Sequence, residues 1–354
     1  YKKNTKFTHK NNIFDSDDKN TKIINVYYKM LISLRGKYDT YEFDLSQESH
    51  IIQKGQKFSS LYRGKRISDN SYVCVKHLHD TQCVQNSEHA HLIFITLTSI
   101  EKLDDAIIRT YDIIETEQGY FIVYEYLHGV TIKTITNTPD YPDLTTSKFA
   151  CKVGIEVCKI LKKLHEHGIV HRNIKPSNIF LETDDSGRIS PDNPRVRLID
   201  FEIASVHGSN IFSLNKVPFS VLYSPPEQVL YFSHLIDERS DLYSLALVVY
   251  EIATRRPSFY HENAAMLINL QINTSIQKNP RISKELFTLL LQATSKHRFS
   301  LPPNKYSQEQ LEAFLDTGRS QRFQNAHDFS LALSEVFRHL NQPKTRKSRK
   351  SFFL

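Results

Sequence analysis

The sequence of 354 residues predicts an α+β protein in which a small β-rich part precedes a larger α-helical part. Short apolar alternations dominate up to about residue 128, and apolar residues recur at helical spacing after Gly129. Hydrophobic residues make up 40% of the chain and charged residues 24%, which permits a sizeable core and excludes wholesale disorder. At ~150 residues per domain, the length corresponds to two units or one large bilobal domain.

Residues 1–40 form an N-terminal extension rich in Asn, Lys and Thr, with one apolar stretch, Ile23–Leu34, that suits a helix or a strand. Residues 41–128 are expected to form the β-rich lobe, a five-stranded sheet with one helix. The expected strands are Tyr41–Leu45, Phe58–Arg63, Ser71–Lys76, Ile107–Thr110 and Tyr120–Tyr126, and the expected helix is Glu88–Leu103.

Residues 129–340 are expected to form the helical lobe. Its first long helix is Thr145–His165, which is strongly amphipathic and ends before Gly168. The other expected helices are Phe232–Thr254, Ala264–Leu270, Ser283–Thr294 and His327–Leu340. Two polar stretches, 182–195 and 297–319, are dense in turn-forming residues and are predicted to be surface insertions.

The net charge of +7 belongs to the ends of the chain. Residues 1–10 contain four Lys and no acid, and the tail 341–354 contains five Lys or Arg and no acid, so the body is nearly neutral. Basic tails can contact anionic surfaces, although plain solvation is the simpler interpretation. No sequence-specific nucleic-acid binding is expected.

No apolar run reaches the roughly 18 residues of a membrane-spanning helix, so no transmembrane segment is predicted. The four cysteines contain no CxxC pair and predict neither a zinc site nor a disulfide framework. No signal peptide is visible, but the chain starts at Tyr1 and a removed signal stays open. The expected localisation is cytoplasmic, or the cytosol of a host into which the protein is delivered.

The decisive segment is His167–Leu181, which reads HGIVHRNIKPSNIFL. It follows an amphipathic helix and precedes a predicted strand, and Asp200 in the sequence LIDF follows farther on. This pattern resembles the catalytic loop and metal-binding motif of Hanks-type serine/threonine protein kinases, with a bacterial appearance. Matching features extend from about residue 45 to residue 340. The resemblance implies a bilobal protein-kinase-like fold, in which Glu227 pairs with Arg322.

The resemblance also implies sites for ATP and Mg²⁺. Lys76 matches the strand lysine that neutralises the α- and β-phosphates, and Lys175 matches the loop lysine that steadies the γ-phosphate. Asn178 and Asp200 match the two side chains that hold Mg²⁺ through oxygen. The adenine site would comprise Tyr124 at the gatekeeper position, backbone groups of Glu125 and Leu127, and the side chains of Leu61, Cys74 and Phe180.

Several positions depart from the family's pattern, and the first is Asn173, which stands where the catalytic aspartate belongs. A carboxamide cannot accept the substrate proton, and loss of a general base costs ~10²–10⁴ in rate. Glu202 replaces the glycine after Asp-Phe and is expected to add negative charge near the metal. Lys54, Gln56 and Ser59 stand where the glycine-rich loop has its glycines.

The helix glutamate that should pair with Lys76 is not evident. Counting along the expected helix leads to Thr96, and Glu88 would serve only if that helix is shifted. The departures are expected to act together, so that restoring Asp at position 173 alone would leave the protein a poor enzyme.

These departures favour a pseudokinase, a nucleotide-sensing or protein-binding scaffold that binds Mg²⁺-ATP weakly. One alternative is an active or weakly active serine/threonine kinase in which Asn173 is engineered or bypassed. Another is a kinase-fold enzyme that catalyses a different ATP-dependent transfer. A protein partner or a protein substrate is expected.

The activation segment, Ile203–Leu222, contains four serines that a kinase could phosphorylate, Ser205, Ser209, Ser213 and Ser220. Arg172 would pair with such a phosphate. A solvated loop with ordinary serines is the simpler interpretation.

Overall fold

A computed structural model of the chain describes residues 5–7, 31–45, 48–53, 59–78, 87–206, 209–210 and 220–342. The chain divides into two compact units. The first comprises Tyr1–His128, Phe201–Ile203 and Asn210–Pro218, and the second comprises Gly129–Asp200, Ala204–Ser209 and Phe219–Leu354. Each unit has its own core and is described by itself.

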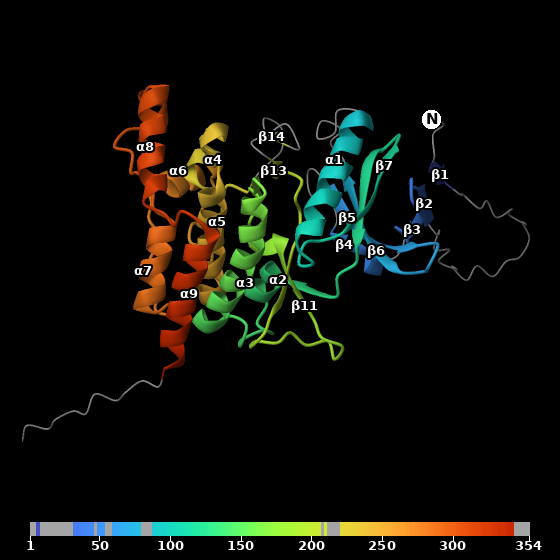
Figure 1. Ribbon diagram of the computed structural model, residues 1–354, viewed down its shortest axis with the longest axis horizontal. Helices are drawn as coiled ribbons and strands as arrows, with labels where there is room; N and C mark the ends of the chain where they lie inside the picture. Colours follow the sequence, from blue (N-terminus) through green and yellow to red (C-terminus); the bar gives the residue numbers. More distant parts are fainter. Residues whose placement is uncertain are drawn as a thin grey trace, which may run out of the picture. The chain divides into compact units, whose positions relative to one another are not determined.

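Within the described residues, the first unit is built on an eight-stranded antiparallel sheet (Figure 1). Its strands are β1 (Thr5–Phe7), β2 (Leu31–Arg35), β3 (Thr40–Asp44), β4 (Ile51–Gln53), β5 (Ser59–Arg66), β6 (Tyr72–Leu78), β7 (Thr110–Thr116) and β8 (Gly119–Glu125). The spatial order is β1-β2-β3-β5-β6-β8-β7, and β4 pairs with β5. The prediction of five strands was too low, because β1 and β2 lie in the expected extension and β4 is only three residues long.

The core of the first unit lies on one face of this sheet. Alternate residues of each strand point to that face, as the burial pattern of β2 shows. The cluster contains Ile32, Leu34, Tyr41, Phe43, Val73, Val75, Ile114, Phe121 and Val123. Helix α1 (Ser87–Ile100) packs against β7 and buries Ile93, Leu97 and Ile100.

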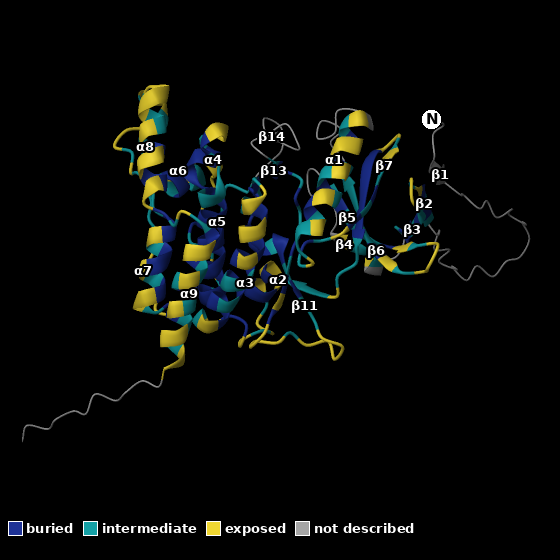
Figure 2. Cartoon of the chain, in the orientation of Figure 1, coloured by how far each residue is buried: buried dark blue, intermediate teal, exposed yellow. Residues whose placement is uncertain are grey.

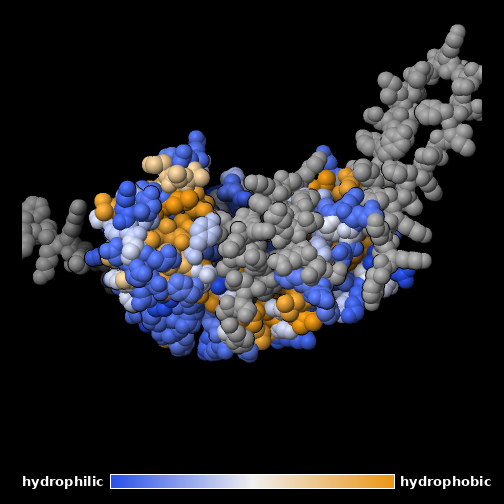
Figure 3. Space-filling view, turned by 90° about the horizontal axis from the view of Figure 1, so that it is seen from above, coloured by the Kyte–Doolittle hydropathy of each residue, from blue (hydrophilic) through white to orange (hydrophobic). Residues whose placement is uncertain are grey.

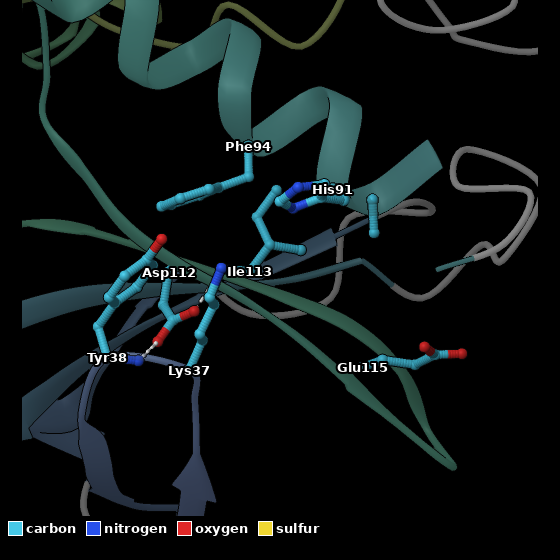
Figure 4. Close-up of a pocket in the computed structure, with 8 residues that line it drawn as sticks. Lys37, Tyr38, His91, Phe94, Asp112, Ile113 and Glu115 are labelled. Carbon is cyan, nitrogen blue, oxygen red and sulfur yellow. Dashed lines mark hydrogen bonds between the residues drawn. The ribbon is translucent and has the colours of Figure 1, made fainter. Parts of the chain in front are cut away.

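The turn between β2 and β3 is tied to β7 by Asp112, which is buried (Figure 4). The Asp112 carboxylate accepts a hydrogen bond from the Tyr38 N–H at 3.1 Å, and burial raises the pKa of this carboxyl. A Cβ at Gly36 would lie 2.0 Å from Asp112 Oδ2, so this position requires glycine. The Tyr38 ring stacks on Phe94 of α1 with centroids 5.5 Å apart, so the hairpin contacts both the sheet and its helix.

The second unit is mainly helical. Its α-helices are α2 (Ile132–Asn137), α3 (Ser147–Glu166), α4 (Pro226–Val229), α5 (Glu238–Thr254), α6 (Ala264–Asn273), α7 (Lys284–Ala293), α8 (Gln308–Ser320) and α9 (Ala326–Asn341). Short strands form two small sheets, ordered β12-β11-β9 and β10-β13-β14. These strands are β9 (Gly129–Thr131), β10 (Ile169–Val170), β11 (Ile179–Glu182), β12 (Arg195–Leu198), β13 (Ser205–Val206) and β14 (Ser209–Asn210).

Single 3₁₀ turns lie between the longer elements in both units. They are η1 (Glu48–His50), η3 (Glu101–Leu103), η4 (Pro176–Asn178), η5 (Ser233–Leu235) and η6 (Pro303–Lys305). The turn η5 explains why α5 begins later than the predicted Phe232. After η5, the Asp237 side chain accepts from the Arg239 N–H and forms a capping box with Ser240, which starts the helix at Glu238.

Helix α5 is the centre of the second unit, because fifteen of its 17 residues are buried (Figure 2). Helix α3 packs against both α5 and α9. A Cβ at Gly154 of α3 would lie 2.8 Å from the Leu333 side chain of α9, so glycine permits this close approach.

The polar stretch 297–319 is more than a surface insertion. It contains most of α8, which begins with a capping box between Ser307 and Gln310. The His297 ring stacks on Phe314 of α8 with centroids 4.2 Å apart. The sequence prediction missed this helix because polar residues dominate it. Residues 184–188, in the other polar stretch, lie exposed between β11 and β12.

The surface seen in Figure 3 is mostly hydrophilic and carries small apolar patches. Exposed large apolar side chains of the second unit include Tyr231, Tyr260, Met266, Leu301 and Leu331. Among the residues that the structure describes, no helix is long and apolar enough to cross a membrane.

A buried ion pair joins α4 to the residues before α9, and it confirms the pairing predicted from the sequence. The Arg322 guanidinium donates two hydrogen bonds to the Glu227 carboxylate, at 2.7 and 3.0 Å. The side chains are 1% and 0% exposed. Ser240 donates a further hydrogen bond to Glu227 at 2.8 Å, so the buried charges are well satisfied.

We predict that Arg322→Ala lowers the free energy of unfolding by about 3–5 kcal/mol, because it leaves the Glu227 carboxylate buried and unpaired. Denaturant unfolding of the whole chain measures this change. Lys159→Ala is the control, since Lys159 pairs with Glu156 on the surface of α3 and its loss should change stability by less than about 0.5 kcal/mol. Equal effects of the two variants would contradict the prediction.

Candidate active site

The loop that follows α3 and β10 is held by Asp241 of α5, whose side chain is fully buried. One carboxylate oxygen accepts from the His171 N–H and the other from the Arg172 N–H, both at 2.8 Å. His165 Nε2 lies 2.9 Å from the same carboxylate. Arg172 has φ of +62°, a left-handed conformation that is uncommon for residues other than glycine. The two hydrogen bonds therefore hold the loop in a backbone conformation that it would not adopt readily alone.

His171 is a neutral, structural residue of this loop. Its Nδ1 accepts a hydrogen bond from the Asn173 N–H at 3.2 Å, so this nitrogen carries no proton. Its Nε2 then donates to the Ile199 carbonyl oxygen at 3.2 Å. Burial lowers the pKa of His171, which favours the same neutral form.

The structure brings four of the predicted site residues together in the second unit. The Asn173 side-chain amide donates to Asp200 Oδ2 at 2.8 Å, and the Asn178 amide donates to the same oxygen at 3.1 Å. Asn178 Nδ2 also donates to the Asn173 carbonyl at 2.8 Å, which fixes its orientation. Lys175 Nζ lies 3.9 Å from Asp200 Oδ2. The cluster therefore consists of one carboxylate surrounded by donors.

Asn173 changes the electrostatics of this cluster. An aspartate there would bring a second carboxylate close to Asp200, an arrangement that needs a cation or a shared proton between the two groups. The carboxamide removes this repulsion and satisfies Asp200 with a hydrogen bond. It also removes the only group at position 173 that could accept a proton from a hydroxyl.

The oxygen donors of Asn178 and Asp200 fit a hard divalent cation such as Mg²⁺. Among the described residues, no group of three or more His, Cys, Asp or Glu side chains could hold a metal ion. Mg²⁺ is usually bound by one or two protein oxygens and completes its shell with phosphate oxygens and water. The donor set therefore suits a metal that arrives with a phosphate ligand.

In the first unit, Lys76 lies in the middle of β6, where its pairing partners are Leu61 of β5 and Ile122 of β8. Cys74 is on the same face of β6, two residues earlier, and pairs with Tyr124. Burial raises the pKa of the Cys74 thiol to about 12, so the thiol stays protonated at neutral pH. Tyr124 is buried as well.

The carboxylate of Glu202 contacts Lys76. Glu202 Oε1 lies 2.6 Å from Lys76 Nζ, and both side chains are 13% exposed. The Tyr124 hydroxyl donates to the same Glu202 oxygen at 3.5 Å. From the sequence, the charge of Glu202 was expected near the metal, and the partner of Lys76 was expected on the helix now seen as α1. Two sequence observations taken together could have predicted this ion pair. The glutamate expected on the helix is missing, and an unexpected glutamate follows Asp-Phe.

Helix α1 does not offer this partner. Glu88 lies exposed in its first turn. The Thr96 hydroxyl donates to the Leu92 carbonyl of the same helix at 2.8 Å.

The backbone expected to contact adenine lies at the end of β8 and just after it. The N–H of Glu125, the last residue of β8, donates to the Arg109 carbonyl at 3.0 Å, so this N–H is not available to a ligand. Leu127 follows the end of β8 and is half-buried. Phe180 is half-buried in β11 of the second unit, where it pairs with Thr131 of β9.

Ser205 is a poor candidate for phosphorylation. It is 2% exposed and lies in β13, paired with Val170 of β10. Arg172 is also buried, and burial lowers the pKa of its guanidinium to about 10. Because neither side chain reaches the surface, this arrangement does not support a phosphate on Ser205 that pairs with Arg172. Ser213 lies outside the described residues.

Lys54 and Gln56, which replace two glycines of the family's loop, lie outside the described residues as well. Ser59, the third of these positions, is the first residue of β5.

Comparison with known proteins gives consistent matches. The protein kinase domain family matches residues 47–322. Over 212 residues, covering 57% of this chain and 31% of the relative, the sequence is 30% identical to the serine/threonine-protein kinase PknB of Mycolicibacterium smegmatis. It is 34% identical over 200 residues to the serine/threonine-protein kinase PrkC of Bacillus subtilis, covering 54% of this chain and 28% of that relative. The chain thus spans about a third of the length of these relatives.

Among solved structures, the autoinhibited serine kinase domain of the giant muscle protein titin matches with a TM-score of 0.56 and 19% sequence identity. The match covers 85% of this chain and 81% of that domain. At this identity, the likeness concerns the fold alone.

We predict that Asp241→Ala lowers the free energy of unfolding by roughly 2–4 kcal/mol, because it leaves two buried backbone N–H groups without acceptors. Denaturant unfolding measures the loss, and hydrogen exchange followed by mass spectrometry should show faster exchange of the loop containing His171 and Arg172. Asp185→Ala, at an exposed position between β11 and β12, is the control and should change neither. Unchanged exchange in the Asp241 variant would contradict the proposed anchoring.

Proposed function

Because this chain belongs to the protein kinase domain family, we propose that it binds Mg²⁺-ATP and engages a protein as substrate or partner, with phosphoryl transfer impaired at position 173. The observation that carries this proposal is the hydrogen bond from the Asn173 amide to Asp200, at 2.8 Å. This bond identifies the side chain at position 173 as a carboxamide donor, and a carboxamide is not basic enough to serve as a general base.

The retained groups support nucleotide binding. Lys76 supplies a cation for the α- and β-phosphates, and Lys175 supplies one for the γ-phosphate. Asn178 and Asp200 would hold Mg²⁺, which neutralises charge on the phosphates when it is bound. Contacts within each unit restrain these side chains. The Asn178 amide donates to Asp200, so it must turn its oxygen toward the metal on binding.

Impaired transfer does not mean that transfer is absent. Phosphoryl transfer depends mainly on positioning and on charge stabilisation, and both can persist without a base. The Asn173 oxygen can still accept a hydrogen bond from a substrate hydroxyl, although it cannot take the proton. A rate reduced by ~10²–10⁴ is therefore expected of the unmodified chain.

The second candidate is an active serine/threonine kinase, and the contact between Lys76 and Glu202 favours it. This contact supplies a carboxylate partner for the lysine, which the sequence alone suggested was missing. Under this candidate, Glu202 no longer counts as a defect and position 173 is the main one. The effect of the loop with Lys54, Gln56 and Ser59 stays a prediction.

We predict that Mg²⁺-ATP raises the melting temperature of the chain. At a concentration of about 100 times Kd, the native state should gain ~2.7 kcal/mol. Thermal unfolding with ATP, with and without Mg²⁺, measures this gain. Asp200→Ala should lose the part that depends on Mg²⁺, whereas Asp185→Ala should retain it. Absence of any shift in the unmodified chain at millimolar ATP would refute nucleotide binding.

We predict that Asn173→Asp increases phosphoryl transfer by ~10²–10⁴, because one general base is restored. The measurement is transfer of radiolabelled phosphate to a basic protein and to the chain itself. The same variant should gain more thermal stability from Mg²⁺ than the unmodified chain does, since a second carboxylate then lies beside Asp200. Asn173→Ala is the control and should stay slow. If Asn173→Asp is as slow as the control, the impairment is distributed over other positions.

A further inference from the structure

The pairing of Lys76 with Glu202 joins a strand residue to a residue far away in the sequence, both within the first unit. The helix packed beside this sheet, α1, has the sequence SEHAHLIFITLTSI, and Glu88 in its exposed first turn is its only carboxylate. The sheet lysine therefore takes a carboxylate from the segment after Asp200.

We infer that Glu202 is the positioning residue of Lys76, and that its carboxylate holds the ammonium group in place for a nucleotide phosphate. This inference rests on the proposed function, since it assigns a role within the same nucleotide site. It replaces the interpretation that Glu202 disturbs the metal.

Both partners are held from several sides. Lys76 belongs to the middle of a strand that is paired on both edges, with Leu61 and with Ile122. The residues flanking Glu202, Phe201 and Ile203, are 2% and 3% exposed, so this segment is anchored by two buried side chains. The Tyr124 hydroxyl adds a hydrogen bond to Glu202. The contact therefore does not depend on two freely moving side chains.

The geometry indicates that Glu202 orients Lys76 for a phosphate and does not compete with the phosphate for it. An ammonium group has three N–H donors, so a lysine can contact a carboxylate and a phosphate oxygen at the same time. The low exposure of both side chains reduces screening by water, so the pair is stronger than an ion pair on the surface. Removal of the carboxylate should loosen the lysine and weaken phosphate binding.

The test compares Glu202→Gln, Glu202→Asp and Glu88→Gln in the full chain. The first readout needs no nucleotide and is the rate at which N-acetoxysuccinimide acetylates Lys76, followed by mass spectrometry. Acylation requires the neutral amine, and a carboxylate partner stabilises the charged form. Glu202→Gln should accelerate labelling of Lys76 by roughly three- to tenfold, with no change at Lys159 of α3.

The second readout is the Kd for Mg²⁺-ATP, measured by titration. Glu202→Gln should raise Kd by roughly tenfold, Glu202→Asp should restore part of the affinity, and Glu88→Gln should match the unmodified chain. Partial rescue by the shorter carboxylate separates a positioning role from a general loss of packing.

The outcomes decide whether Glu202 or Glu88 positions Lys76. Faster labelling in Glu202→Gln alone supports the inference, even if the unmodified chain fails to bind Mg²⁺-ATP and the proposed function falls. Unchanged labelling in Glu202→Gln overturns it, as does an equal or larger effect of Glu88→Gln. A lower Kd in Glu202→Gln would show that Glu202 competes with the nucleotide for Lys76, which also overturns it.

Discussion

The arrangement of the site in the second unit depends on the hydrogen bonds that the buried carboxylate of Asp241 accepts. It lies on α5, which is almost entirely enclosed by protein, and it satisfies two backbone donors of the loop that carries Asn173. The Arg172 carbonyl of that loop accepts a hydrogen bond from Gln228 of α4, and the adjacent Glu227 is fixed by Arg322. The core thus specifies the loop backbone from both sides, and the loop in turn fixes Asn178 and the contacts of Asp200.

The predicted kinase fold is confirmed by the family match and by the structural likeness. The catalytic loop could be identified from the sequence because its characteristic residues lie close together along the chain. The pair formed by Glu227 and Arg322 could be predicted only because the resemblance linked two distant segments. Long helices with a regular apolar face, such as α3, were placed to within two residues.

Other features of the structure could not be predicted from a local sequence pattern. The apolar stretch that contains β2 is compatible with a helix or a strand, and only pairing with β3 decides between them. Helix α8 is polar on most of its surface, so its capping box was a better signal than its hydrophobicity. The contact between residues 76 and 202 is a tertiary one that neither segment encodes alone. Its consequence is that one short segment, Asp200 to Glu202, carries both the carboxylate proposed to hold Mg²⁺ and the partner of the lysine.

The segment that matches the kinase family, residues 47–322, is shorter than the folded part of the chain. The family match begins at residue 47, whereas Tyr41 and Phe43 of β3 are among the largest fully buried side chains of the part of the chain that the structure describes. A recombinant fragment trimmed to the matched residues would expose the apolar face of the sheet and the unpaired edge of β5, which favours aggregation. It would also lack α9, which covers α3. Expression boundaries for this protein should therefore be drawn outside the hairpin formed by β2 and β3 and beyond the end of α9.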